Sequence, residues 1–246
     1  MLNIADNLDH IHHRIQRITK IVGRISDDIV LLAVSKGQPA QAIRNAYELG
    51  QRHFGENYLQ EALEKQQQLS DLTDICWHFI GPVQSNKTRK VAERFDWVHT
   101  VDRIKLAQRL SALRPESQAP INICLQVNIN KEKSKSGLLA ENVEDLAQSV
   151  LELPRVKLRG LMTIPQNNQT ETGQHESFAA IAQLLTKLRN SSPQLATLDT
   201  LSMGMSADLE IAITEGATII RVGTGIFGPR QTPQKIPEDN TDQLDS

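Results

Sequence analysis

Apolar runs that end in short polar turns alternate with amphipathic stretches along almost the whole chain. The runs predict eight strands, at residues 29–34, 52–54, 76–80, 97–101, 121–129, 158–164, 198–202 and 219–222. The stretches between them predict helices over 39–49, 58–69, 85–93, 103–113, 140–153, 174–190 and 206–215. Strands separated by helical crossovers pair in parallel, and eight such units in 246 residues fit a closed (β/α)8 barrel. An open, doubly wound sheet is the alternative, because the order of elements does not prove closure.

Two further segments flank these units. Apolar residues recur at spacings of three and four over 4–22, which predicts an extra N-terminal amphipathic helix before the first strand. After Gly228 the pattern gives way to three prolines and polar residues, and the last ten positions hold four acids and no Lys or Arg. We therefore expect one α/β domain, a (β/α)8 TIM barrel over 1–230, followed by a disordered acidic tail over 231–246.

Composition excludes several classes of protein. The 27 Lys and Arg nearly balance the 29 Asp and Glu, and only 4% of the residues are aromatic, so no nucleic-acid partner is expected. The longest apolar run, 29–34, is far too short to cross a membrane, and the N-terminus has no secretory signal. Cys76 and Cys124 lie in apolar runs and are expected as buried, free thiols. These features predict a cytoplasmic protein, and the lack of a large extra apolar surface favours a monomer.

Glycine and hydroxyl residues gather where the last two predicted strands end. The two loops are Ser202-Met203-Gly204-Met205-Ser206 and Arg221-Val222-Gly223-Thr224-Gly225. In (β/α)8 barrels the C-terminal ends of the strands form the active face, and the loops after strands seven and eight often bind phosphate. Glycine lets backbone N–H groups approach an anion closely. The two loops together favour a phosphate site, while Ser206 also fits the N-cap of the next helix.

Lys36 stands at the same end of the first predicted strand, after six apolar residues. A lysine held near low-dielectric walls binds its proton less tightly and becomes a nucleophile that can form a Schiff base. A solvated lysine at a strand end is the plain alternative. Together with the two loops, Lys36 favours a carbonyl ligand that carries a phosphate, such as pyridoxal 5′-phosphate (PLP) or a sugar phosphate.

Arg221 lies inside the eighth predicted strand, between Ile220 and Val222. Successive side chains of a strand point to opposite faces, so Arg221 points into the barrel mouth if its neighbours pack outward on the helices. A buried guanidinium needs a partner. A pyridine nitrogen is one acceptor that fits, and a structural ion pair with a barrel carboxylate is the alternative.

At this point a set of ordered motifs resembles a known family. The motifs are Val34-Ser35-Lys36, Phe54-Gly55-Glu56-Asn57-Tyr58, Trp77-His78-Phe79-Ile80-Gly81, Gln84-Ser85-Asn86-Lys87, Ser134-Lys135-Ser136-Gly137, Gly160-Leu161-Met162, Ser202-Met203-Gly204-Met205-Ser206-Ala207-Asp208 and Arg221-Val222-Gly223-Thr224-Gly225-Ile226-Phe227-Gly228. They resemble the YggS/PROSC family of pyridoxal phosphate homeostasis proteins, in the same order, over about residues 3–230. The resemblance implies a single barrel like the N-terminal domain of bacterial alanine racemase, with PLP as its cofactor.

The resemblance also implies a role for each matching residue. Lys36 would form the internal aldimine with PLP, and Arg221 would face the pyridine nitrogen. The other residues implied in cofactor binding are Ser206, Gly223 and Thr224 at the phosphate, Ser202, Met203 and Gly204 near it, and Asn57 and Met162 along the ring.

Binding a cofactor does not by itself give catalysis. Racemases of this barrel type take one acid–base group from a second, β-rich domain, and eight βα units leave no residues here for such a domain. We therefore expect a PLP-binding protein of PLP homeostasis without strong catalytic activity, with PLP-requiring apo-enzymes as candidate partners. A PLP-dependent racemase acting through Lys36 is the alternative. A Schiff-base aldolase without PLP and a pure protein-interaction role are further alternatives.

The seven histidines carry no metal-binding signature, and no metal site is expected. His10, His12 and His13 lie on the first predicted helix and fit a solvated face. His78 and His99 lie in strands and are expected as hydrogen-bonded histidines of the core or mouth. Lys135, on the loop after the fifth strand, is a secondary candidate to accept the cofactor.

Overall fold

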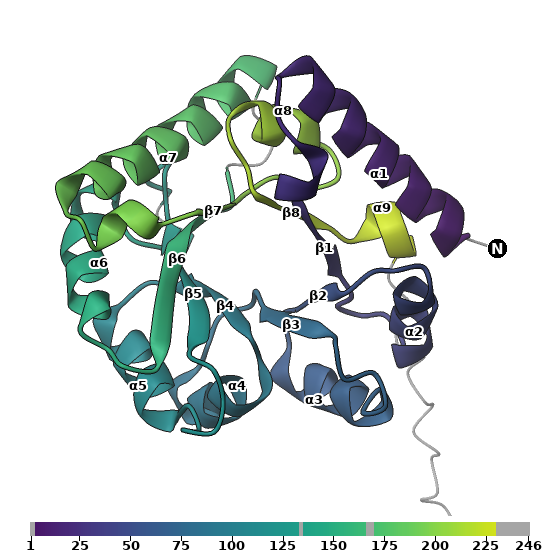
Figure 1. Ribbon diagram of the computed structural model, residues 1–246, viewed down its shortest axis with the longest axis horizontal. Helices are drawn as coiled ribbons and strands as arrows, with labels where there is room; N and C mark the ends of the chain where they lie inside the picture. The colour runs from purple at the N-terminus through teal and green to yellow at the C-terminus, as the bar shows by residue number, and fades with distance from the viewer. Residues whose placement is uncertain (1–2, 133–134, 166–169, 230–246) are drawn as a thin grey trace, which may run out of the picture.

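Eight parallel strands form a closed barrel in the part of the chain that the structure, a computed structural model, describes: residues 3–132, 135–165 and 170–229. Each strand pairs with the next along the chain, and the last pairs with the first, with Arg221 opposite Leu32 (Figure 1). The strands are β1 Val30–Val34, β2 His53–Glu56, β3 Cys76–Phe79, β4 Trp97–Val101, β5 Ile121–Val127, β6 Val156–Thr163, β7 Thr200–Ser202 and β8 Ile219–Val222.

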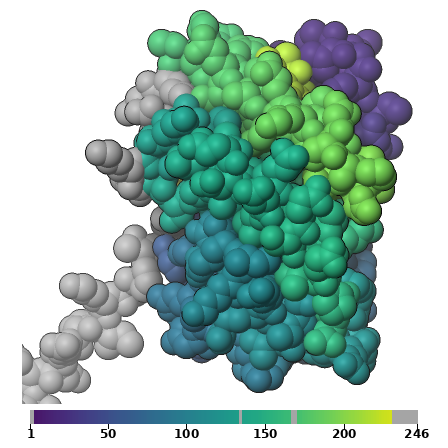
Figure 2. Space-filling view, turned by 90° about the vertical axis from the view of Figure 1, so that its left-hand side faces the viewer, coloured from purple at the N-terminus to yellow at the C-terminus, as the bar shows by residue number. Residues whose placement is uncertain are grey.

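Helices cover the outside of this sheet. They are α1 Ile4–Ile21, α2 Ala40–Glu48, α3 Leu59–Gln68, α4 Thr88–Arg94, α5 Ile104–Leu113, α6 Val143–Leu151, α7 Glu171–Ser191, α8 Leu209–Thr214 and α9 Thr224–Phe227. Short 3₁₀ helices stand before β1, α4, α6 and β7, at Ser26–Asp28, Ser85–Lys87, Ala140–Asn142 and Leu195–Thr197. On the side that carries α5, α6 and α7, the helical layer forms the outer surface of the molecule (Figure 2).

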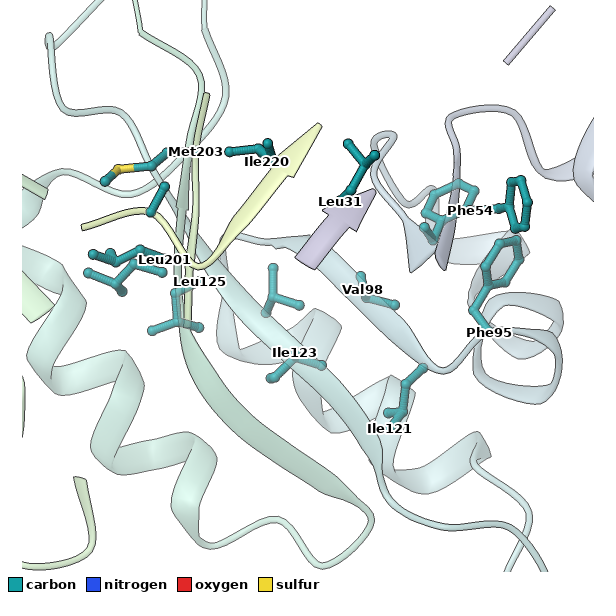
Figure 3. Close-up of a cluster of buried hydrophobic side chains, with 14 of the residues drawn as sticks. Leu31, Phe54, Phe95, Val98, Ile121, Ile123, Leu125, Leu201, Met203 and Ile220 are labelled. Atoms are coloured by element: carbon teal, nitrogen blue, oxygen red, sulfur yellow. The ribbon is translucent and has the colours of Figure 1, made fainter. Parts of the chain in front are cut away.

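The alternation of side chains along each strand divides the core into two layers. Outward-facing residues pack under the helices, as with Ile121, Ile123 and Leu125 of β5 and Ile220 of β8 (Figure 3). A smaller apolar cluster fills the barrel interior, where the buried residues are Leu32, Trp97, Cys124, Met162 and Ile219. Polar side chains share this interior, and they carry the chemistry described below.

Helix α1 is the extra N-terminal helix that its periodicity predicts. The Asn3 side chain caps it by accepting from the Ala5 N–H, and its apolar face is buried. It packs on α8 and α9 (Figure 1). Asn7 Nδ2 donates to the Ile226 carbonyl, and Arg14 forms a bidentate ion pair with Glu210 of α8. The helix thereby supports the two βα units that end the barrel.

The predicted (β/α)8 barrel is confirmed, and the open sheet is excluded by the pairing of β8 with β1. Helix α9, which follows β8, was not predicted because four residues give no periodicity. Cys124 is buried as expected, whereas Cys76 at the start of β3 is only partly buried. Among the described residues, no helix is long and apolar enough to cross a membrane. The predicted acidic tail, 231–246, lies outside the described residues.

Candidate functional site

A cavity of about 320 Å³ opens at the carboxyl ends of the strands, a volume within the range of small-molecule sites. Seven of the ten residues predicted for the cofactor line it: Lys36, Asn57, Met162, Ser206, Arg221, Gly223 and Thr224. They come from β6 and β8 and from the segments after β1, β2, β7 and β8, which is the face that barrel topology predicts.

Lys36 follows β1 and is half-buried at the cavity wall. Both of its neighbours are held by helix α3. Lys65 Nζ donates to the Ser35 carbonyl at 2.7 Å, and the Gly37 N–H donates to Glu61 Oε1 at 2.6 Å. Gly37 has a φ of +71°, which glycine adopts without strain. The backbone at Lys36 is therefore fixed from both sides.

The groups that hold this backbone form a buried ionic cluster between α3 and the barrel wall. Lys65 Nζ lies 2.7 Å from Glu56 Oε1 and 2.5 Å from Glu61 Oε1. The Ser35 hydroxyl donates to Glu56 Oε1 at 2.6 Å. Burial raises the pKa of the Glu56 carboxyl, and the charge and hydrogen bond of Lys65 oppose that rise. The cluster is thus a cation shared by two carboxylates rather than a simple pair.

Arg221 points into the barrel, as its place between two outward-facing residues predicts. Its guanidinium reaches two neighbouring strand ends. Nη1 donates to the Ser202 carbonyl at 2.6 Å and to Ser202 Oγ at 2.9 Å, and Nη2 donates to the Thr163 carbonyl at 2.9 Å. Burial lowers the pKa of Arg221 to about 10, so it still carries its charge at neutral pH. Arg221 is a fixed cation in the cavity floor.

The two glycine-bearing loops meet at the cavity rim. A Cβ atom built on Gly225 would lie 3.1 Å from Ser206 Oγ, so the loop after β8 passes close to the loop after β7. Helix α9 begins at Thr224, and the first N–H groups of a helix have no partner within it. The N-cap of α8 is Asp208 rather than Ser206, and Asp208 Oδ1 accepts from the Met205 N–H. Ser206 therefore has a hydroxyl at the rim that does not cap the helix.

Asn57 and Met162 stand on the cavity wall with apolar neighbours, Val34 and Ile80. Asn57 Oδ1 is buried and has no hydrogen-bond partner among the described residues. A buried polar atom of this kind is costly unless a ligand or water completes it. Asn57 is also tightly placed, since a Cβ on Gly81 would come within 2.1 Å of its carbonyl oxygen. The orphaned amide oxygen fits a ligand with a polar substituent.

Three predicted residues lie next to the cavity lining rather than in it. Ser202 is buried beneath Arg221 and bonds to it. Met203 packs outward, beside Leu201 and Ile220 (Figure 3). Gly204 accepts from the Arg221 N–H at 3.0 Å and has a φ of +90°. Lys135, the secondary candidate, donates to the Pro165 carbonyl and pairs with Glu132, and it is not among the lining residues.

Sequence reasoning missed other lining residues: Val34, Gln38, Ile80, Ile164, Met205, Ala207 and Gly228. Six of them lie within a few positions of a residue that was predicted, and the seventh, Ile80, directly follows β3. Listing every residue near a strand's carboxyl end would have found most of them, but not which side chains turn inward. Chemically, the cavity combines an amine, a fixed cation and backbone donors, which suits a carbonyl ligand with an anionic group.

Comparison with known proteins places these features in a family. Residues 7–231 match the family described as alanine racemase, N-terminal domain. A pyridoxal phosphate homeostasis protein of Pseudomonas aeruginosa is 53% identical over 230 residues, which cover 94% of this chain and 97% of that protein. The protein of the same name from Escherichia coli K12 is 46% identical over 237 residues, covering 96% and 100%.

Solved structures agree with the sequence matches. PipY of Synechococcus elongatus, in a structure with PLP bound, superposes with a TM-score of 0.81 at 41% identity, covering 92% of this chain and all of that one. An alanine racemase of Clostridium difficile shares the fold alone, with a TM-score of 0.73 at 12% identity over 94% of this chain and 58% of that one. On this evidence of sequence and fold, the chain belongs to the alanine racemase N-terminal domain family and, within it, to the pyridoxal phosphate homeostasis proteins.

Proposed function

We propose that this chain binds PLP in the cavity and serves PLP homeostasis, holding the cofactor on Lys36. The observation that carries the proposal is that Lys36 and Arg221 line one cavity with the loops after β7 and β8. PLP offers an aldehyde, a pyridine nitrogen and a phosphate, and each has a matching group there. The relative PipY, whose structure contains PLP, supports the same ligand.

In this proposal Lys36 binds the aldehyde of PLP and Arg221 binds its pyridine nitrogen. Lys36 Nζ would hold the cofactor covalently through its aldehyde carbon, with water as the leaving group. Arg221 donates a hydrogen bond to the pyridine nitrogen. Because the pKa of Arg221 stays near 10, the guanidinium keeps its proton, and the ring nitrogen is left unprotonated. PLP held in this way would supply a weaker electron sink than it does beside a carboxylate.

The remaining lining residues hold the rest of the molecule. Ser206, Gly223 and Thr224 bind the phosphate through a hydroxyl and backbone N–H groups. Asn57 and Met162 contact the ring, and the orphaned Asn57 Oδ1 is supporting evidence for a polar partner there.

Three residues act from outside the lining. Ser202 and Gly204 hold Arg221 through its side chain and its N–H. Met203 anchors the β7 loop in the outer core.

The same cavity supports a carrier rather than a racemase. Racemisation needs acid–base groups on both faces of the reacting carbon. Among the described residues that line the cavity, the ionisable ones are Lys36 and Arg221. We propose that the protein buffers PLP or delivers it to PLP-requiring apo-enzymes, as a monomer. The two free cysteines support a reducing compartment, and we place the protein in the cytoplasm.

The test is a visible spectrum of the purified protein with PLP, followed by borohydride reduction and peptide mapping. The expected result is a yellow band and a reduced adduct on the peptide that contains Lys36. Lys36→Ala should remove both, while Lys135→Ala, the matched control, should keep both. An adduct on Lys135 or elsewhere would overturn the site assignment, and a colourless protein would favour the aldolase alternative.

A second measurement tests the carrier assignment. The PLP-loaded protein is incubated with D- and L-alanine, and the products are separated on a chiral column. The expected result is no robust interconversion. Sustained turnover that disappears in Lys36→Ala would replace the carrier with a racemase.

A further inference from the structure

Three histidines from neighbouring strands lie in a row inside the barrel. His53 Nδ1 is 2.9 Å from His78 Nε2, and His78 Nδ1 is 2.9 Å from His99 Nε2. They belong to β2, β3 and β4 in that order. His78 and His99 are fully buried, whereas His53 begins β2 and is only partly buried. The row therefore starts near the amino ends of the strands and leads inward.

The row continues across the barrel to the cavity. His99 Nδ1 is 2.8 Å from Ser202 Oγ, and that oxygen is 2.9 Å from Arg221 Nη1. Strand β4 pairs with β3 and β5, and not with β7, so the contact between His99 and Ser202 passes through the interior. A continuous hydrogen-bonded chain thus joins His53, at the amino end of β2, to Arg221 in the cavity floor.

The direction of this chain follows from the chemistry of arginine. A guanidinium only donates, so Ser202 Oγ accepts from Arg221. With the Ser202 hydroxyl donating to His99 Nδ1, His99 Nε2–H donates to His78, and His78 Nε2–H donates to His53. Each ring then turns its lone pair toward the cation. We assign the tautomers from this network, as the hydrogen-bond partners require.

The histidines of the chain are neutral. Burial and the charge of Arg221 lower the pKa of His99 to about 3, and burial lowers the pKa of His78 well below its usual value. Burial also lowers the pKa of His53, against the charge of Asp96. Arg221 itself faces Asp208 and Cys124 besides the chain. On the side of the histidine chain, Arg221 is therefore held by neutral hydrogen-bonding groups rather than by an ion pair.

A metal is the other use that this chemistry permits. His53, Cys76 and His78 offer ligand atoms that all lie within 4.8 Å of one another. Two nitrogens bound at 2.0–2.1 Å to a tetrahedral zinc lie about 3.3 Å apart, whereas these rings approach to 2.9 Å, a hydrogen-bond distance. The geometry favours the hydrogen bond, and zinc becomes an outcome of the test.

We propose that Ser202, His99 and His78 are positioning residues for Arg221, holding its guanidinium in one orientation at the cavity, where it would meet the pyridine nitrogen. The inference rests on the proposed function. Carbonyls of Ser202 and Thr163 fix the two terminal nitrogens, and the chain fixes the serine hydroxyl that would otherwise rotate. The chain therefore acts on the bound cofactor without touching it.

The experiment measures the PLP-loaded full-length protein and its variants His99→Leu, His99→Asn and Ser202→Ala. Leucine removes both contacts of the ring, whereas asparagine keeps an amide near the position of Nδ1. His175, which pairs with Glu215 on the surface, gives the matched control His175→Leu. The readouts are the rate of PLP release into a trapping apo-enzyme, the pH midpoint of the visible band and the melting temperature.

His99→Leu should release PLP about tenfold faster, since the loss of one hydrogen bond beside a charged group is worth roughly that factor. It should also move the pH midpoint of the band. His99→Asn should recover part of both effects, and Ser202→Ala should resemble His99→Leu. His175→Leu should match the wild type. If His99→Leu does not fold, the inference is tested with His99→Asn and Ser202→Ala instead. Their rates of PLP release and pH midpoints are then compared with those of the wild type.

Failure of the proposed function and failure of the positioning inference give different results. A wild-type protein without a visible band or a Lys36 adduct would overturn the proposed function itself. A normal wild type, with chain variants that lower the melting temperature but leave release and pH midpoint unchanged, would make these residues merely structural and overturn the inference. Spectra after dialysis against EDTA and again with Zn²⁺ complete the test. A zinc-induced change that His53→Gln abolishes would assign the cluster to a metal and overturn the chain.

Discussion

The two basic residues of the cavity, Lys36 and Arg221, are supported by contacts of opposite kinds. Behind Lys36, outside the barrel wall, Lys65 is shared between Glu56 and Glu61. Behind Arg221, inside the barrel, a hydroxyl and neutral imidazoles form a chain. The ionic cluster binds the backbone on either side of Lys36, whereas the neutral chain binds the side chain of Arg221 itself. In the proposed function, the group that forms the covalent bond is thus held by its backbone, and the group that faces the pyridine nitrogen is held by its side chain.

The two supports also respond to pH with opposite signs. The folded-state pKa of Glu56 is raised, so its contribution to stability falls as the pH rises above the unfolded value of about 4.5. The folded-state pKa values of His78 and His99 are lowered, so their contribution falls as the pH drops below about 6.5. At neutral pH the two histidines therefore keep nearly their full contribution to stability, whereas the contribution of Glu56 is already reduced.

Removing the cation of the ionic cluster should have the largest effect. Lys65→Met leaves the Glu56 carboxylate buried without its partner, and should lower the free energy of unfolding by about 3–5 kcal/mol. The deficit should shrink at lower pH, because the carboxyl takes up a proton. Urea unfolding at pH 7.5 and 5.5 measures the loss of unfolding free energy and its dependence on pH. Lys187→Met, at an exposed pair, is the control. A deficit as small as that of the control would show that the cluster is not a buried charge pair.

Removing the hydroxyl that joins the cluster to β1 should come next. Ser35→Ala deletes a buried donor to a carboxylate, and should cost about 2 kcal/mol. Ser149→Ala removes an exposed hydroxyl that donates to the Asp145 carbonyl of its own helix, and it should change little. Thermal unfolding of the two variants makes the comparison. Equal melting temperatures would mean that the Ser35 hydroxyl contributes nothing net.

Lowering the pH should destabilise the protein through the neutral histidines of the hydrogen-bonded chain. Each histidine that stays unprotonated when folded should lower the free energy of unfolding by about 1.4 kcal/mol between pH 7.5 and pH 5.5. His99→Asn removes one such group, so its urea midpoint should depend less steeply on pH than that of the wild type. The slope is compared rather than the absolute stability, since the other titrating groups are common to both proteins. Identical slopes would refute a neutral, buried His99.

A half-buried pair near the surface sets the lower end of the scale. Arg14 and Glu210 form a bidentate ion pair between α1 and α8 with both side chains partly in solvent. Solvent screening limits such a pair, so Arg14→Met should cost about 1 kcal/mol or less and should matter less in 1 M salt. A loss as large as that of Lys65→Met would erase the distinction between buried and exposed charge on which the comparison rests.

Most of the fold followed from local pattern, because strands and helices are repeated in a regular order. The inward direction of Arg221 also followed, since its alternation with Ile220 and Val222 depends on neighbours in the sequence. The contacts that support Lys36 and Arg221 could not be predicted from local sequence pattern. Lys65 meets Ser35 across 30 residues, a contact that depends on the pairing of β1 with β2. His99 meets Ser202 across 103 residues, a contact that depends on the closed barrel. His78 and His99 were expected as hydrogen-bonded histidines, which is confirmed, but their partners needed the three-dimensional register.

Because β8 pairs with β1, the two ends of the barrel meet beside the cavity. During synthesis Lys36 leaves the ribosome early and Arg221 late, and domains fold as units once their long-range pairings are available. A nascent chain that lacks β8 has an open edge and no guanidinium, so it offers its ligand an incomplete site. A ligand that needs both Lys36 and Arg221 can therefore be held in full only after β8 has closed the barrel.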